Sequence, residues 1–250
     1  MIARVVVFAV VTAVSVVVFG GLQQATGLRV DIGIPQLAPG VAGLLMLLIF
    51  RKDGHPLTWV RAETPPKRYG LALAMPLGIN AVVFMLSLLL LQGFSLSSYR
   101  LEASALMLLW MPLGALGEEI GWRGYLQKRL NVQTSGRAAA VITGVLWTFL
   151  HVHFFANGPI FMLFTTLLFV SMSIVMQAVL ADQDFSVLLA TLFHIGINIG
   201  SLLLVTIVND LSFMVIFSLV WAGAAGAAVA LRREFFFKAP SGAQIASASA

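Results

Sequence analysis

Hydrophobic positions along the chain gather into about eight long apolar segments that are separated by short polar connections. The segments cover residues 4–22, 36–50, 69–92, 103–127, 138–155, 159–180, 186–207 and 211–231. An α-helix needs roughly 20 apolar residues to cross about 30 Å of hydrocarbon, and most of the segments come close to that length. The pattern therefore predicts an all-α, polytopic membrane protein, in which Pro76 kinks the third helix without ending it.

The composition agrees with this class of protein. Of 250 residues, 60% are hydrophobic and 10% are charged, and the mean hydropathy is +0.98. We expect residues 1–238 to form one transmembrane helical domain and the small, polar residues 239–250 to form a short disordered cytoplasmic tail. The first segment is longer than a signal-peptide core and no clear cleavage site follows it, so we interpret it as a retained helix. The lack of cysteine excludes disulfide frameworks, thiol catalysis and cysteine-ligated metal sites.

The basic residues predict the orientation of the helices, because lysine and arginine in short loops remain on the cytoplasmic side. With a cytoplasmic N-terminus, that side receives 12 of the 15 basic residues: Arg4, Arg51, Lys52, Arg61, Lys67, Arg68, Lys128, Arg129, Arg137, Arg232, Arg233 and Lys238. Arg29 and Arg100 fall on the other side, and Arg123 lies within a segment. We therefore expect a multi-pass protein of the plasma (inner) membrane with both termini cytoplasmic. The net charge of +5 reflects this topology and an attraction to membrane lipids, and it does not indicate nucleic-acid binding.

Three ionisable residues interrupt the fourth segment within "GEEIGWRGY". A charged side chain at the centre of a membrane helix costs about 2.5–3.5 kcal/mol, so such residues need partners or a water-filled cavity. Glu119 and Arg123 have the i, i+4 spacing of a helical ion pair. Glu118 is rotated about 100° from Glu119, has Trp122 four residues later, and is left free to act as a general acid, a general base or a cation ligand. Alternatively, the cluster lies at the cytoplasmic helix end near Lys128 and is solvated.

Two later segments carry further polar side chains. His194 and Asn198 are i, i+4 and share one helix face, where both can bind a metal or stabilise an oxyanion. His151 and His153 are i, i+2, so on a helix they point about 200° apart and only one can readily face a shared interior. A lone histidine on an apolar helix is most often an interhelical hydrogen-bonding residue. Polar groups on three separate segments nevertheless favour a common site.

In order, these groups are EExxxR at Glu118, Glu119 and Arg123, an aromatic residue four positions before a histidine at Trp147 and His151, and HxxxN at His194 and Asn198. This order resembles the CPBP family of intramembrane proteases, which are the type II CAAX prenyl endopeptidases and bacterial relatives that include Abi and bacteriocin-immunity proteins. The resemblance covers residues 118–198, and "GEEIGWRGYLQ" is typical of bacterial members. The family usually has phenylalanine at the position of Trp147, and an aromatic packing role survives that change.

The resemblance implies a helical bundle that encloses a polar cavity and hydrolyses a peptide bond of a peptide or lipidated protein substrate. Glu118, assisted by His151, would activate a water molecule and later protonate the leaving amine. His194 and Asn198 would stabilise the oxyanion.

In the same scheme, Glu119 and Arg123 would hold the helix and the carboxylate environment in place. His153 would be a packing or interface residue, or would support the catalytic residues from behind. No cofactor is required. A second mechanism is open in which His151, His194 and a carboxylate bind Zn²⁺, although the chain lacks HExxH and every other compact zinc-protease motif.

Two other functions stay open. One is a non-catalytic scaffold or immunity protein of the same family, because function depends on the site and not on the fold. The other is a proton- or cation-coupled transporter with a relay through Glu118, His151 and His194. The lack of an internal repeat disfavours the transporter. GxSxG and the phosphate-binding loops are also absent, so serine and nucleotide chemistry are not expected.

Overall fold

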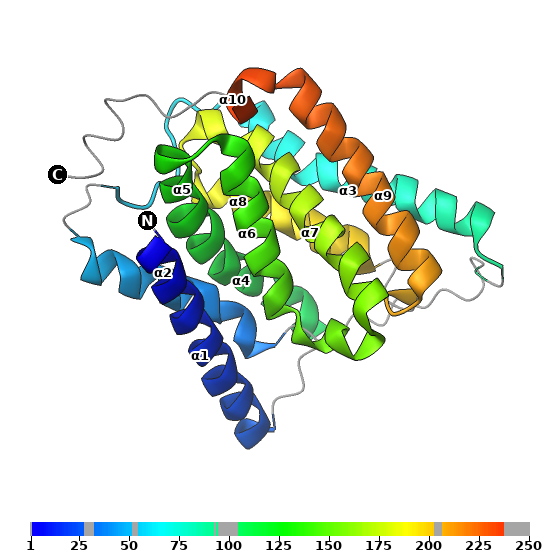
Figure 1. Ribbon diagram of the computed structural model, residues 1–250, viewed down its shortest axis with the longest axis horizontal. Coiled ribbons are helices and arrows are strands. Elements are labelled where there is room, and N and C mark those ends of the chain that lie inside the picture. The colour runs from blue at the N-terminus through cyan, green and yellow to red at the C-terminus, as the bar shows by residue number, and fades with distance from the viewer. Residues whose placement is uncertain are drawn as a thin grey trace.

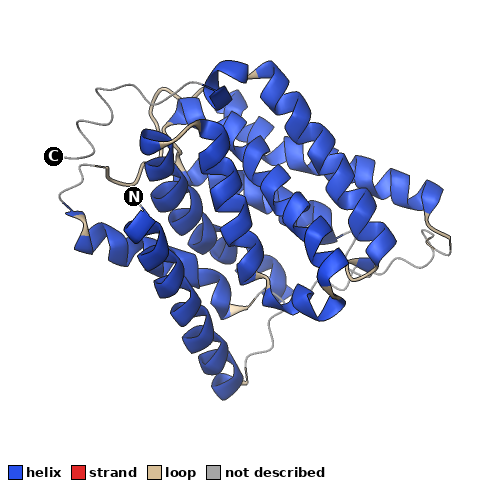
Figure 2. Ribbon diagram, in the orientation of Figure 1, coloured by secondary structure: helices blue, strands red, loops and turns tan. Residues whose placement is uncertain are grey.

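Helices make up all the regular structure in the described part of the chain (Figure 2). The computed structural model describes residues 2–27, 33–51, 55–92, 94, 105–202 and 207–237. The predicted tail and four of the basic residues, Arg29, Lys52, Arg100 and Lys238, lie outside these ranges.

Each of the eight predicted segments contains a helix, which confirms the all-α membrane class. The elements are α1 (Ile2–Thr26), η1 (Ile34–Leu37), α2 (Ala38–Ile49), α3 (Pro66–Leu90), α4 (Ala105–Glu119), η4 (Ile120–Gln127), α5 (Lys128–Gln133), α6 (Gly136–Leu150), η5 (Val152–Asn157), α7 (Pro159–Leu180), η6 (Ala181–Gln183), α8 (Val187–Leu202), α9 (Leu211–Leu231) and α10 (Arg233–Phe237). By length and hydropathy, α1, α3, the α7–η6 run and α9 can each cross a membrane, and three further apolar helices are shorter.

Local sequence explains several helix ends. The side chain of Ser135 accepts a hydrogen bond from the Ala138 amide at the start of α6, and Asp210 caps α9 in the same way. Gly158 has φ +88°, a conformation that suits glycine, and Pro159 then opens α7. Pro76 lies inside α3 without ending it, as the sequence predicts.

The run from α4 through η4 to α5 lies at the centre of the bundle. The helices α2 and α8 both pack against α4 and η4, α6 packs on α7, and α3 covers α8 and α9. The first helix, α1, contacts mainly α2 and η1 and diverges from the other helices towards its C-terminal end (Figure 1). The central run is therefore enclosed by neighbouring helices, and this is the run that carries the three ionisable residues of the fourth segment.

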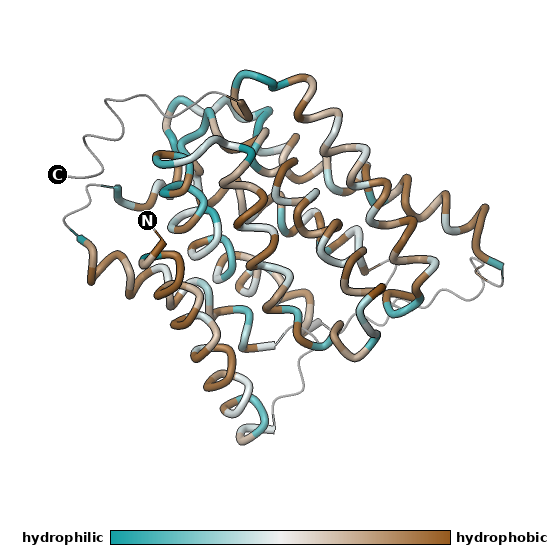
Figure 3. The backbone as a smooth tube through the Cα atoms, in the orientation of Figure 1, coloured by the Kyte–Doolittle hydropathy of each residue, from teal (hydrophilic) through white to brown (hydrophobic). Residues whose placement is uncertain are grey.

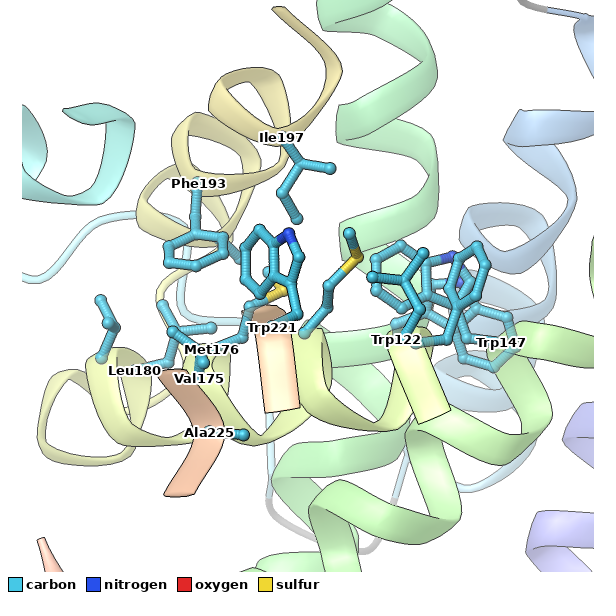
Figure 4. Packing of buried hydrophobic residues seen from close by; sticks show 14 of the residues in the cluster. Trp122, Trp147, Val175, Met176, Leu180, Phe193, Ile197, Trp221 and Ala225 are labelled. Carbon is cyan, nitrogen blue, oxygen red and sulfur yellow. The ribbon is translucent and has the colours of Figure 1, made fainter. Parts of the chain in front are cut away.

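One buried polar contact fixes α8 in place. Asn80 of α3 accepts a hydrogen bond from the Trp221 indole of α9 at 2.9 Å and donates one to the Ile197 carbonyl of α8 at 3.1 Å. Trp221 lies beside Phe193 and Ile197 in the apolar core (Figure 4). Asn80 thus links α3, α8 and α9 at Ile197, the residue that precedes Asn198.

Basic side chains gather at one end of the bundle. Arg68 and Arg232 form ion pairs with Asp182 at 2.9 and 3.2 Å, and Lys128 pairs with Asp184 at 2.9 Å. The hydrophilic stretches around α5 and α10 lie at this end in Figure 3. Segments that the charge pattern assigned to one side of the membrane are therefore in contact with each other.

Candidate active site

The two glutamates end α4, and the helix then changes type. Residues 120–127 form a π-helix, η4, which is buried along its whole length. A π-helical turn bonds i to i+5, is rare, and occurs frequently at functional sites. The sequence pattern does not predict this change, because the apolar spacing alone does not distinguish a π-helix from an α-helix.

Small residues allow α2 to approach the π-helix closely. A Cβ atom on Gly121 would overlap the backbone of Pro39, and one on Gly40 would lie 2.5 Å from the Gly117 carbonyl oxygen. Glycine is required here for close contact between backbones. The glycines of "GEEIGWRGY" therefore set the position of the glutamates, a role that the sequence analysis missed.

Glu119 and Arg123 form the predicted ion pair. Glu119 Oε1 accepts a hydrogen bond from Arg123 Nη1 at 2.9 Å, and His194 Nδ1 lies 2.7 Å from the same oxygen. Glu119 and Arg123 are both 0% exposed. The Arg123 guanidinium also lies over the Trp147 ring, 4.3 Å from its centre. The contact with His194, 75 positions away in the sequence, could not be predicted from spacing within a helix.

Glu118 has different surroundings. Its Oε2 accepts a hydrogen bond from the Trp147 indole at 2.6 Å, and within the described residues it forms no ion pair. Glu118 lines a cavity of about 370 Å³ together with His151 and residues of α1 and η1. Trp147 thus does more than pack: its N–H holds the carboxylate, a contact that phenylalanine at this position could not make.

His151 lies where α6 ends, and this overturns one expectation. The predicted helix at 138–155 stops at Leu150, and His151 begins a 3₁₀ turn. The 200° separation expected for His151 and His153 therefore does not apply, because it assumed an α-helix. Both histidines line the cavity with Glu118, and their ring centres are 5.8 Å apart. The expectation that only one of the two histidines readily faces a shared interior therefore does not hold.

The remaining two candidates lie on α8. His194 is buried and turned towards Glu119, with its ring 5.4 Å from that of Trp147. Asn198 Nδ2 is buried and has no hydrogen-bond partner within the described residues. Neither residue is among those that line the 370 Å³ cavity. The structure therefore joins His194 to the carboxylate pair and leaves Asn198 as a donor without a partner in the described chain.

The same geometry bears on the predicted metal site. Across the described ranges, no three histidine, aspartate or glutamate side chains form a group that could hold a metal ion. Nδ1 of His194 faces Glu119, and Nδ1 of His151 lies 3.0 Å from the Trp147 carbonyl oxygen. Each of these two histidines thus directs Nδ1 to a protein oxygen, and Zn²⁺ binding by His151, His194 and a carboxylate stays a prediction.

Comparison with known proteins agrees with the arrangement of these motifs. Residues 100–200 match the family described as Type II CAAX prenyl endopeptidase Rce1-like. The matched region contains all the candidate residues from Glu118 to Asn198. No curated protein matches the chain. Residues 100–200 are therefore similar to the type II CAAX prenyl endopeptidases, the group that the three sequence motifs also resemble.

Proposed function

We propose that the protein is an intramembrane endopeptidase that hydrolyses a peptide bond of a membrane-associated substrate. The observation that carries this proposal is the division between the two adjacent glutamates. Glu118 lines a cavity that it shares with His151, whereas Glu119 is enclosed with Arg123 and His194. A carboxylate at a cavity wall can reach a water molecule, and a sealed one cannot.

Glu118 acts as the general base in this proposal. The Trp147 indole holds Oε2 at 2.6 Å, so Oε1 is the oxygen that accepts a proton from water. The resulting hydroxide attacks the scissile carbonyl carbon, and Glu118 returns the proton to the leaving amine when the C–N bond breaks.

His151 orients the water. Its Nδ1 lies 3.0 Å from the Trp147 carbonyl oxygen, which can only accept, so Nδ1 carries the hydrogen. In the neutral ring Nε2 is then an acceptor for a water hydrogen. The same residue, Trp147, thus fixes both members of the pair: its indole holds Glu118 and its carbonyl selects the tautomer of His151.

In this proposal, two side chains of α8 stabilise the oxyanion that forms on the scissile carbonyl. Asn198 Nδ2 is a buried donor without a partner in the described chain, and a peptide oxyanion that reached it from the cavity would supply that partner. His194 directs Nδ1 to Glu119, so it donates a second bond through Nε2 when the ring is protonated. Glu119 and Arg123 hold this histidine and the π-helix in position.

The substrate is a peptide or lipidated protein. The cavity walls are mainly apolar, with Pro39 and Leu150 among them, and Gln23 and Gln36 add amide groups that suit a peptide backbone. The family description refers to CAAX prenyl substrates. We therefore place the substrate among membrane-anchored chains that insert an extended segment into the cavity from the plasma membrane.

A comparison of membrane-associated peptides in cells tests the proposal and identifies the substrate in the same experiment. Cells lacking the native gene receive wild type, Glu118→Gln or Glu234→Gln, the last being the same change at an exposed position of α10. We expect an uncleaved precursor to accumulate with Glu118→Gln alone, while its cleavage product appears in the other two. Identical peptide pools in all three strains would contradict hydrolysis and favour a scaffold or immunity role.

A further inference from the structure

A second cavity, of about 450 Å³, lies at the basic end of the bundle. Its walls are formed by the C-terminal half of α2 and its end, including Leu44, Leu47 and Arg51, by the segment that contains Trp59, and by Arg129 of α5. It shares no lining residue with the cavity that contains Glu118. The proposed proteolysis does not use it.

The lining is cationic. Arg51 and Arg129 both contribute, and none of the described residues that line the cavity is acidic. Arg129 is held in a fixed position, since Nη2 donates to the His55 carbonyl at 2.6 Å and its guanidinium lies 4.1 Å from the centre of the Tyr125 ring. Arg51 is exposed at the end of α2. One arginine is therefore fixed in the wall, and the other is free to move towards an anion that enters.

The same cavity continues into an apolar surface. Leu44 and Leu47 form part of its wall, and Leu48 on the adjoining face of α2 is 72% exposed. Trp59 lines the cavity and is 51% exposed. Tryptophan is enriched where a membrane helix meets the headgroup region, and exposed leucines on such a helix face acyl chains. The two arginines are therefore placed to meet the phosphate of a lipid, and the leucines of α2 are placed to meet its acyl chains.

We propose that this cavity binds one anionic phospholipid of the surrounding bilayer. Its phosphate contacts Arg51 and Arg129, which suit planar, bidentate recognition of phosphate oxygens. Its acyl chains lie along Leu44, Leu47 and the exposed face of α2. A soluble phosphate would use the arginines but would leave the adjoining leucines without a role, so the lipid is the occupant that accounts for both surfaces. Basic pockets on the cytoplasmic side of helical bundles bind lipid headgroups in this way.

Lipid titration of the purified protein in neutral detergent tests the site. Native mass spectrometry counts the lipids bound when phosphatidylglycerol or phosphatidylcholine is added. We expect one phosphatidylglycerol to bind in preference to phosphatidylcholine. The change Arg51→Gln should weaken phosphatidylglycerol binding about fivefold, the equivalent of one arginine near a membrane surface. The matched control is Arg233→Gln, at an exposed arginine of the same end outside the cavity, and it should leave binding unchanged.

A second variant tests the cavity independently of its charge. Leu44→Trp fills space at the wall while both arginines remain, and it should also weaken binding of phosphatidylglycerol. Arg51→Gln is less disruptive to the fold than a change at Arg129, because Arg51 is exposed, whereas Arg129 is nearly buried and bonded to two carbonyls.

Three results would overturn the proposal. Equal binding of phosphatidylcholine would show general apolar adhesion, and equal losses in Arg51→Gln and Arg233→Gln would show attraction to the whole basic end. Competition by inorganic phosphate, with Leu44→Trp unaffected, would identify a soluble anion as the occupant.

Discussion

Glu118 and Glu119 are neighbours in the chain, but their carboxylates lie in different surroundings. Glu119 is paired with Arg123 and His194 and is sealed from solvent, whereas Glu118 accepts one indole hydrogen bond and lines a cavity. The π-helix that follows does not disturb the i, i+4 pair at its start. We therefore propose that Glu119 stabilises the fold and that Glu118 is the carboxylate available for chemistry.

A double-mutant cycle on thermal unfolding in detergent measures this division. Removing one member of a buried ion pair costs about 3–5 kcal/mol, so Glu119→Gln should lower the melting temperature strongly. Glu118→Gln should cost much less, because glutamine still offers an oxygen to the Trp147 indole. In an Arg123→Met background, Glu119→Gln should lose most of its effect, with a remainder from His194. Equal losses for the two glutamines, without coupling to Arg123, would show that the roles are reversed.

At this scale the sequence predicts contacts within one helix well and contacts between helices poorly. Helical spacing alone predicts the Glu119–Arg123 pair. It does not predict that His194 joins this pair, or that Trp147 donates to Glu118, because these contacts depend on how separate helices pack. The expectation that His151 and His153 point apart fails for a local reason, since α6 ends before them.

Helix positions, in contrast, follow from hydropathy, because lipid permits few alternatives to a helix. The extent of each apolar run predicts α7 and α9 closely, at 159–180 and 211–231. The π-helix at 120–127 is different, since hydropathy does not distinguish it from an α-helix, and it lies where α2 approaches closely. The sequence shows the glycines that permit this approach, but the contacts that require glycine become visible only once the two helices are packed together.

Substitution of Gly121 tests whether this close packing holds the site. Gly121→Ala places a methyl group against the Pro39 backbone, and overpacking of this kind costs about 1–3 kcal/mol. Gly78→Ala is the matched control, because a Cβ there meets open space within α3 and should stabilise by about 0.5–1 kcal/mol. Melting temperatures measured side by side should move in opposite directions. A neutral Gly121→Ala would show that α2 and η4 can separate freely.

Asp184 is a carboxylate outside the spanning helices, and it accepts hydrogen bonds from Thr58 and Lys128 shortly before α8 begins. Burial raises the pKa of Asp184, but hydrogen bonds from Thr58 and Lys128 outweigh it, so the pKa is lowered from its ordinary 3.8. A lowered folded-state pKa gives stability that is present above 3.8 and lost as pH falls through the folded value. The melting temperature of wild type should therefore exceed that of Asp184→Asn at neutral pH, and the gap should close in strong acid. A gap that persists there would contradict a charged role for Asp184.

At the scale of the whole molecule, the bundle has two different ends: basic side chains gather at one, and the turn at Asn157 lies at the other. Contacts among Arg68, Arg232 and Asp182 place three distant segments at the basic end. The opposite end contains the turn at Asn157, which bonds to Asn209 at 3.1 Å. The charge rule assigns the basic end to the cytoplasm, so the orientation is a prediction about these two ends.

Labelling of single cysteines tests that orientation cleanly, because the chain contains none of its own. Val60→Cys lies at the exposed basic end, and Asn157→Cys lies at the other. In intact cells a membrane-impermeant maleimide should label Asn157→Cys alone, and Val60→Cys should react only after the membrane is opened. The reverse pattern would place both termini outside.

The central claim is that Glu118 activates a water molecule for peptide hydrolysis, and the cleavage rate of the purified protein tests it most directly. Wild type and Glu118→Gln are reconstituted in lipid nanodiscs with the precursor that accumulates in cells carrying Glu118→Gln. Loss of a general base lowers the rate typically by about 10²–10⁴-fold, and we expect a loss of that size with only a small change in melting temperature. A Glu118→Gln protein that is folded and still cleaves at the wild-type rate would contradict the account.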